Sequence, residues 1–389
     1  MKQPKVFIAG AATALMVTDA ASAEDASAVS FAADYTTDLL ANVSGGADTG
    51  FRRLDSLDVT LGVDLERFIG LDHTQVFVYG LYNNGQSISE LAGDAQAVSS
   101  IEAPVEAARL YEAWIDHRFG GGPLSVRAGL YDINSEFDVL EATNFFIHGA
   151  HGTGTDLGQS GRNGPSVFPF TSLAARAEID FGGGLKFRTA IADGAPGDPD
   201  HPKRTAVKLG NGDGAFIISE AEFSNDRFRV IGGGWNYTSE FERYDGAMGD
   251  DNDGFYAGGE ISLTGHALEG ARGVVAFLRA GQADGDYNQF SKYYSAGLVW
   301  KTPLLAEGDA IGLGVAWSHA SAAFLAANPF FAGNEAAIEF SASVAATEWL
   351  TVQPQVQYII NPSAEAGLDD AVVVGVRASA SLNGLVNSF

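Results

Sequence analysis

The chain has no cysteine, so no disulfide can stabilise it and its fold depends on burial and hydrogen bonding. After residue 23 it also lacks an unbroken apolar run of about 18 residues, which is the length that a membrane-spanning helix needs. Basic residues are scarce, because 23 Lys and Arg face 49 Asp and Glu for a formal net charge of −26. Such acidity disfavours nucleic acid and phosphate-bearing ligands. We therefore expect neither a helical membrane protein nor a nucleic-acid partner.

The first 23 residues have the pattern of a secretory signal peptide. Lys2 and Lys5 precede an apolar run over residues 6–17, and Ala21-Ser22-Ala23 forms a small-residue cleavage site. The alternative, an N-terminal membrane anchor, is disfavoured because the run is too short to span a bilayer. We expect residues 1–23 to be cleaved on export and residues 24–389 to form one domain.

Glycine and aromatic residues are plentiful. The 389 residues include 48 glycines, 25 Phe and 12 Tyr, at a mean hydropathy of +0.02. This profile is typical of membrane β-strands, in which lipid-facing and water-facing residues alternate and cancel on average. Sixteen candidate strands lie near 29–43, 51–66, 73–84, 106–119, 122–131, 172–181, 184–193, 215–224, 227–239, 254–263, 273–283, 292–301, 309–318, 336–345, 350–360 and 371–382.

Several of these segments alternate strictly. In 124–131 the apolar side carries Leu124, Val126, Ala128 and Leu130, and the other side carries Ser125, Arg127, Gly129 and Tyr131. The glycines at 232–234 leave the register of 227–239 ambiguous and favour a bulge there.

The connections between candidate strands fall into two classes. Those after even-numbered strands are mostly short, as at 120–121 and 182–183, whereas those after odd-numbered strands are mostly long: 85–105, 132–171, 194–214, 240–253 and 319–335. Short periplasmic turns and long extracellular loops are typical of outer-membrane barrels. A soluble β-helix or sandwich has no reason to sort its loops in this way. We predict an all-β fold, a transmembrane antiparallel β-barrel of about sixteen strands in the cell outer membrane.

A barrel of sixteen strands encloses an aqueous lumen, so the predicted function is a channel. An arginine that faces carboxylates offers planar donors suited to hydroxyl-rich solutes. The alternative is that these charges pair with one another and only keep the wall hydrated. The candidate pore residues are Glu112, Trp114, Asp116, Arg127, Glu136, Arg176, Glu178 and Arg377.

Two of these candidates have further alternatives. Trp114 shares its parity with Glu112 and Asp116, so it could stack on sugar rings, or it could belong to the aromatic belt at the membrane interface. Glu136 lies in the longest loop, 132–171, which we expect to fold inward and narrow the pore rather than to cover the surface as a lid.

Catalytic and metal signatures are weak. No G-x-S-x-G or H-E-x-x-H motif occurs, and His148 and His151 on a glycine-rich loop are a poor metal site. The segment Gly249–Glu260 imitates a calcium loop but begins with glycine rather than aspartate. We expect no cofactor, no metal and no enzyme, unless a loop carboxylate closely approaches His148 or His151. A loop-mediated adhesin is a third alternative.

Two segments carry a resemblance to a known family: LYEAWIDHRFGGGPLSVRAGLYDINSEF at 110–137 and EFSASVAATEWLTVQPQVQYIINPSAEAGLDDAVVVGVR at 339–377. The chain resembles the carbohydrate-selective porins of Gram-negative outer membranes, the OprB type. The resemblance implies a sixteen-stranded barrel, monomeric or trimeric, that passes small sugars passively without a cofactor amid outer-membrane lipid and lipopolysaccharide. It also implies pore roles for Glu112, Trp114, Arg127, Glu136 and Arg377. A general-diffusion porin without sugar selectivity is the alternative. Such barrels end on an aromatic residue, but Phe389 is out of register with Leu382.

Overall fold

The computed structural model describes residues 27–207, 210, 212–331 and 333–382. The expected signal peptide at 1–23 and the terminal Phe389 lie outside these residues. The wall strands are β1 (Val29–Ser44), β2 (Gly50–Asp64), β3 (Thr74–Asn84), β4 (Glu106–Arg118), β5 (Leu124–Tyr131), β6 (Ser172–Gly182), β7 (Leu185–Asp193), β8 (Ala215–Ser224), β9 (Phe228–Tyr237), β12 (Asp253–Gly265), β13 (Gly273–Ala283), β14 (Phe290–Lys301), β15 (Ala310–Ala320), β16 (Asn334–Ala345), β17 (Leu350–Ile360) and β18 (Ala371–Ser381). A separate hairpin joins β10 (Phe241–Glu242) to β11 (Met248–Gly249), and short helices occur at α1 (Leu65–Ile69), α2 (Ser89–Ala92), α3 (Thr155–Gly158) and α4 (Ala322–Ala327).

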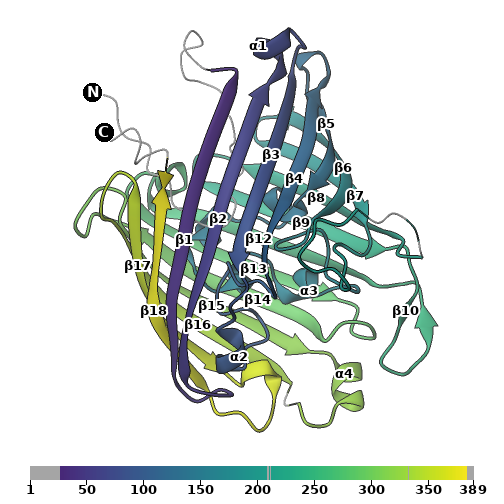
Figure 1. Ribbon diagram of the computed structural model, residues 1–389, viewed down its shortest axis with the longest axis vertical. Helices are drawn as coiled ribbons and strands as arrows, with labels where there is room; N and C mark the ends of the chain where they lie inside the picture. The colour runs from purple at the N-terminus through teal and green to yellow at the C-terminus, as the bar shows by residue number, and fades with distance from the viewer. Residues whose placement is uncertain (1–26, 208–209, 211, 332, 383–389) are drawn as a thin grey trace.

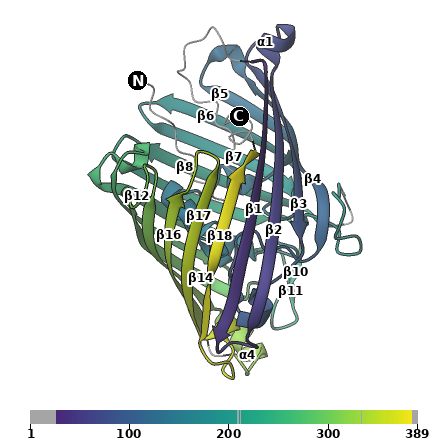
Figure 2. The same ribbon diagram turned by 60° about the vertical axis from the view of Figure 1, so that its left-hand side comes forward.

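The sixteen wall strands form one closed antiparallel barrel. Each strand pairs with its neighbours in the chain, and β1 pairs with β18 to close the sheet, with Asp34 opposite Ser381 (Figures 1 and 2). Closure leaves no free strand edge in the wall. The predicted barrel and its strand number are confirmed.

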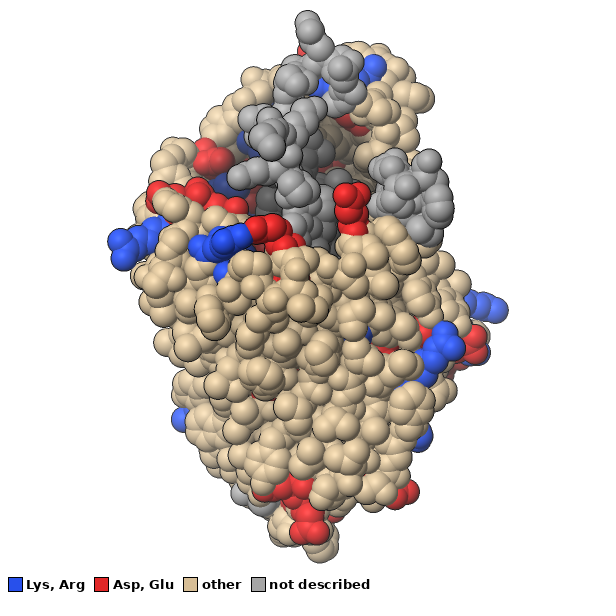
Figure 3. All heavy atoms as spheres, turned by 90° about the vertical axis from the view of Figure 1, so that its left-hand side faces the viewer, with Lys and Arg blue, Asp and Glu red and all other residues tan. Residues whose placement is uncertain are grey.

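The alternation seen in the sequence sets which face of each strand points outward. Apolar side chains such as Phe31, Leu298, Leu313 and Phe340 are exposed on the outer face. In Figure 3 the middle of the face turned to the viewer is a broad uncharged area, with charged residues above it, below it and at its right-hand edge. A wall that is apolar outside and polar inside is the pattern that membrane barrels require.

The strand bounds follow the predicted segments within a few residues, with two informative differences. β2 ends at Asp64, because this side chain accepts hydrogen bonds from the backbone N–H groups of Glu66 and Arg67 at 3.0 and 3.3 Å and caps α1. The bulge expected at 232–234 is wrong, since β9 pairs without a register shift with both neighbours. Gly233 instead makes room for Tyr256, whose ring would lie 2.5 Å from a Cβ there.

The two ends of the barrel differ as the loop lengths predicted. Figure 1 places α1 at one end and α2 and α4 at the other, beside the long connections. Because the strand number is even, β1 begins and β18 ends at the same end. None of the helices in the described parts of the chain is both long and apolar enough to cross a membrane.

Candidate pore site

The longest connection, residues 132–171, which we call the inner loop, lies inside the barrel. Its short helical turns at Ile133–Ser135, Glu141–Phe145 and Gly149–His151 are followed by α3. Its apolar side chains pack on lumen-facing residues of the wall and are almost completely buried: Ile133, Phe137, Leu140, Phe145, Phe146 and Leu157. The expectation that this loop folds inward is confirmed.

Glycines on the inner face of the wall make this packing possible. A Cβ at Gly314 of β15 would lie 2.9 Å from the His151 ring, and a Cβ at Gly258 of β12 would lie 3.2 Å from Leu140. Both distances are shorter than ordinary van der Waals contact. The wall therefore lacks side chains where the inner loop needs space.

Three wall glutamates hold the inner loop by its main chain. The Glu260 carboxylate accepts from the N–H groups of residues 141 and 142 at 3.0 and 2.8 Å. The Glu339 carboxylate accepts from those of residues 147 and 148 at 2.9 and 2.8 Å, and Glu220 from that of Asp138 at 2.8 Å. Buried carboxylates need such donors, and buried N–H groups need such acceptors. The loop is thereby fastened across the lumen.

The connection 85–105, which we call the companion loop, also folds inward. Its buried side chains Ile88, Leu91, Ala92, Val98 and Ile101 pack against inward-facing residues of β1, β2, β16, β17 and β18. Backbone hydrogen bonds join the two loops, from Ser100 N to Ile147 O at 2.8 Å and from Gly149 N to Ala97 O at 2.7 Å. The sequence did not predict this second inward loop.

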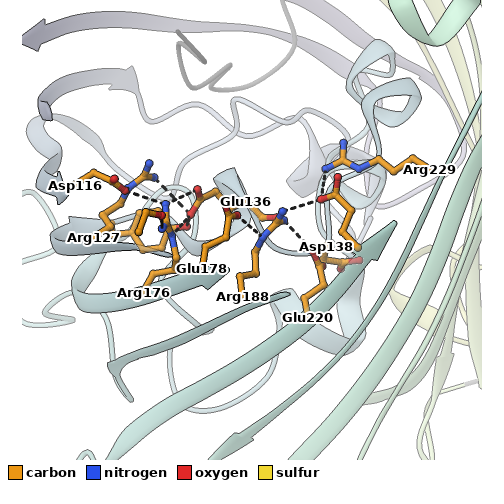
Figure 4. Close-up of polar contacts among 12 residues, drawn as sticks. Asp116, Arg127, Glu136, Asp138, Arg176, Glu178, Arg188, Glu220 and Arg229 are labelled. Carbon is orange, nitrogen blue, oxygen red and sulfur yellow. Dashed lines mark hydrogen bonds and ion pairs between the residues drawn. The ribbon is translucent and has the colours of Figure 1, made fainter. Parts of the chain in front are cut away.

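Four charged residues meet between the inner loop and the wall, and we call them the pore cluster: Asp116 of β4, Arg127 of β5, Glu136 of the inner loop and Arg176 of β6. Arg176 donates to Glu136 at 2.9 and 2.8 Å and to Asp116 at 3.0 Å. Arg127 donates to Asp116 at 3.2 Å and lies 3.6 Å from Glu136. Figure 4 shows these side chains at one end of a row of ion pairs.

The members of the pore cluster differ in their access to water. The Arg127, Asp116 and Glu136 side chains are 12%, 16% and 16% exposed, whereas Arg176 is 3% exposed behind them. Burial alone would raise the pKa of the Glu136 carboxyl, but the Arg127 and Arg176 guanidinium groups outweigh it and hold this pKa at about 2. Glu136 is therefore ionised at neutral pH.

The row of charges continues along the wall beyond the pore cluster. Arg188 of β7 donates to Glu178 at 3.2 Å, to Glu220 at 3.0 Å and to Glu222 at 2.7 Å. Arg229 of β9 then bridges Glu222 to Glu141 of the inner loop (Figure 4 labels Glu178, Arg188, Glu220 and Arg229). Glu178 thus belongs to this continuation, two residues beyond Arg176 on β6.

Trp114 and Glu112 flank the pore cluster on β4. The pairing register confirms that Trp114 and Glu112 both face the lumen. A β-bulge at Tyr111 turns the Tyr111 side chain inward as well. Phe77 stacks on Trp114 with ring centroids 5.0 Å apart, and the Arg127 guanidinium lies 3.7 Å from the ring centroid. These two partners come from the strands on either side of β4, so both faces of the indole ring are covered. Its Nε1–H donates to the buried Glu112 carboxylate at 2.7 Å.

The structure places Arg377 apart from the other candidates. On β18 it forms two hydrogen bonds of 2.7 Å with Asp38 of β1 and one of 3.1 Å with Ser100 of the companion loop. It is 4% exposed. In this position Arg377 fastens the companion loop to the seam where the barrel closes.

The histidines of the inner loop do meet a carboxylate, but in a closed setting. His148 Nδ1 accepts from Ala150 N–H at 3.3 Å, so the proton on Nε2 faces Asp94 Oδ1 at 3.4 Å. Both side chains are 0% exposed, which leaves no room for a substrate. Burial lowers the pKa of His148, and it lowers that of His151 to about 3, so neither carries a charge at neutral pH. No cluster of three or more potential metal ligands occurs among the described residues.

Sequence reasoning missed several carboxylates of the loops and the wall that organise the site. Asp138 and Asp156 of the inner loop meet Arg279, and Asp38 meets Arg377. One signal was available, because the loops contain apolar runs such as Phe145-Phe146-Ile147 that an exposed loop would not tolerate.

Comparisons with known proteins agree with this geometry. A family model described as carbohydrate-selective porin, OprB family, matches residues 48–382, which include every wall strand except β1. Porin B of Pseudomonas aeruginosa is 23% identical over 399 residues, covering 89% of this chain and 86% of that protein. The high-pH structure of Pseudomonas putida OprB has a TM-score of 0.80 at 20% identity, covering 91% of this chain and 94% of that one. The outer membrane channel DcaP of Acinetobacter baumannii has a TM-score of 0.57 at 9% identity, with coverages of 91% and 96%. The chain belongs to the OprB family of carbohydrate-selective porins, which are outer-membrane channels and not enzymes.

Proposed function

We propose that the barrel passes small neutral sugars by passive diffusion and that the pore cluster selects them. The observation that carries this proposal is the partial exposure of Arg127, Asp116 and Glu136 at the edge of the inner loop. Together they present planar guanidinium donors beside carboxylate acceptors, and a sugar offers hydroxyl groups that both donate and accept. Hydroxyl pairs on a sugar ring match such a surface better than an apolar solute does.

The charge balance of the cluster favours neutral solutes. Two arginines, Arg127 and Arg176, are matched by Asp116 and Glu136, so neither sign is in large excess. The carboxylates would repel a phosphate, and the arginines would repel a cation. Trp114 contributes by holding Arg127 in place, since its ring faces are already covered by Phe77 and by Arg127 itself.

A liposome-swelling assay tests the proposal. Vesicles that contain the porin are exposed to glucose, an amino acid and a phosphate ester of similar size, and we expect glucose to enter fastest. Glu136→Gln should reduce the preference for glucose. The matched control is Arg53→Gln, on the outer face of β2 and 59% exposed, which should leave it unchanged. Equal rates for the three solutes would contradict sugar selectivity and leave a general-diffusion porin.

We also propose outer-membrane lipid and lipopolysaccharide as partners of the outer face. Leu313, Trp300 and Phe340 are about half exposed there, as lipid contact requires. The acidic loops would approach lipopolysaccharide phosphates through divalent cations. Chelation should then lower the thermal stability in vesicles containing lipopolysaccharide and not in vesicles of neutral phospholipid; equal loss in both would contradict this partner.

Export through a signal peptide completes the proposal. Lys2, Lys5 and the Ala21-Ser22-Ala23 site support cleavage after residue 23. N-terminal sequencing of the protein isolated from outer membranes should begin at Glu24, and retention of Met1 would contradict it.

A further inference from the structure

Arg279 joins two distant parts of the inner loop to the wall. It lies on the inner face of β13 and is 5% exposed. Its Nε and Nη2 atoms donate to the two carboxylate oxygens of Asp138 at 3.1 and 2.7 Å, and its Nη1 donates to Asp156. A fork of this kind fixes orientation as well as distance, because both carboxylate oxygens are bound in one plane.

Asp138 needs such a partner because its backbone is unusual. Its φ of +58° lies in the left-handed region, which residues other than glycine rarely adopt. The Asp138 N–H donates to Glu220 at 2.8 Å, so backbone and side chain are both held. At this point the inner loop turns from the wall of β5 and β6 toward the wall of β12 and β13.

The turn at Asp138 determines where Glu136 lies, because only one residue separates them. The Glu136 carbonyl accepts from Arg188, and its carboxylate binds Arg176 at 2.8 Å in the pore cluster. If the turn opened, Glu136 would move away from the pore cluster, and Arg127 and Arg176 would then have less negative charge beside them. We propose that Arg279 is a positioning residue of the pore, which sets the charge of the pore cluster through Asp138 without contacting the permeant.

The direction in which ion selectivity changes when Arg279 is replaced distinguishes a positioning role from a direct effect of its charge. Removal of the positive charge of Arg279 would by itself make the lumen more negative and favour cations. Loss of Glu136 from the pore cluster would instead leave Arg127 and Arg176 in excess and favour anions. Arg279→Gln should therefore shift the permeability ratio of K⁺ to Cl⁻ toward Cl⁻, by about twofold, and raise the conductance as the inner loop moves away.

The experiment measures reversal potentials across a KCl gradient in planar bilayers. Glu136→Gln should shift them toward anions, and the double variant Glu136→Gln/Arg279→Gln should shift them no further than the larger single effect. Arg272→Gln is the matched control. Arg272 directly precedes β13, its side chain is 63% exposed, and it pairs with Glu307. Its substitution should change neither the reversal potential nor the conductance. Folding of each variant is checked by its heat-dependent electrophoretic mobility.

A second variant covers the case in which Arg279→Gln does not fold. Gly281 lies two residues further along β13, and a Cβ there would occupy the space of the Asp156 carboxylate and the Arg279 guanidinium. Gly281→Ala changes no charge, so any shift toward anions must come from displacement. A shift toward cations in Arg279→Gln, or unchanged reversal potentials in both folded variants, would overturn the inference.

This inference rests on the proposed function only in taking Glu136 as a pore charge. If Glu136→Gln itself leaves the reversal potential unchanged, the proposed pore cluster is wrong. If Glu136→Gln shifts it and neither Arg279→Gln nor Gly281→Ala does, the role of Arg279 alone is wrong. Sugar selectivity is measured separately by swelling.

Discussion

Glu136 and Arg176 are joined by two hydrogen bonds, from Nε and Nη2 of the arginine to the two carboxylate oxygens, at 2.9 and 2.8 Å. The pair links the inner loop to the barrel wall at the point where the loop reaches water. Its geometry is bidentate, which is the strongest arrangement that these two groups can form. The same contact therefore stabilises the loop and supplies charge to the pore.

The first prediction concerns the pH dependence of this pair. Arg127 and Arg176 hold the pKa of Glu136 at about 2, below its ordinary value of 4.5. A carboxyl with a lowered pKa contributes stability that is fully present above the unfolded value and is lost as the pH falls toward the folded one. Thermal unfolding in detergent should show Glu136→Gln to be less stable than the wild type at pH 7, with the difference shrinking between pH 4.5 and 2. A difference that stayed constant down to pH 2 would contradict the assignment.

The second prediction concerns the main-chain anchors. Glu339→Ala removes the acceptor for two buried N–H groups, those of Ile147 and His148. We expect a loss of about 2 kcal/mol or more in the free energy of unfolding, because each bond to a charged acceptor contributes about 1.5–3 kcal/mol. Glu307→Ala, at a side chain that is 67% exposed, is the control and should stay within about 0.5 kcal/mol of the wild type. Equal stability of the two variants in urea titrations would argue against anchoring.

The third prediction concerns Asp94 in the companion loop. Burial raises its pKa to about 7, so the folded chain retains a proton that the unfolded chain loses above pH 3.8. Stability contributed by this site should therefore fall as the pH rises from about 4 to 7. Asp94→Asn should melt at a higher temperature than the wild type at pH 8 and at a similar temperature at pH 4. Asp226→Asn, in an exposed turn, is the control. It should raise the melting temperature at pH 8 by less than Asp94→Asn does, and an equal rise would contradict burial as the cause.

The fourth prediction concerns the planar donors of Arg127. Arg127→Lys keeps the positive charge but loses the flat guanidinium that lies 3.7 Å from the Trp114 ring. Since lysine cannot stack or bind in a fork, we expect glucose-driven swelling to slow about threefold while KCl conductance changes little. Arg53→Lys on the outer face serves as the control. If Arg127→Lys reduced glucose entry and conductance in proportion, the arginine would act by size or charge alone.

The sequence predicted the barrel well because a membrane wall imposes a period of two on every strand. Leu57, Val59 and Leu61 alternate with polar residues, and the pairing of β1 with β2 places them on the outer face as expected. The wall candidates Glu112, Trp114, Asp116 and Arg127 were placed in the lumen by the same parity, and the structure confirms their orientation. Their roles in selection stay predictions.

The loops were less predictable, because no period relates a loop residue to its partner. Glu136 was named for its position in a long loop and for the family resemblance, but its contact with Arg176 depends on a turn at Asp138 that no local pattern predicts. Arg377 was grouped with the pore residues by parity and by the family resemblance, although parity gives the face of the wall and not the place around its circumference. The Asp38 side chain that binds Arg377 lies 339 positions earlier in the chain.

The main-chain anchors of the inner loop do not depend on the identity of its exposed side chains. Glu260 and Glu339 recognise N–H groups that every residue except proline possesses. The loop could therefore acquire new side chains toward the pore, and with them a preference for another solute, without losing its attachment. A library that randomises exposed loop positions and excludes proline at 141, 142, 147 and 148 would keep the attachment of the loop and vary the side chains that face the pore.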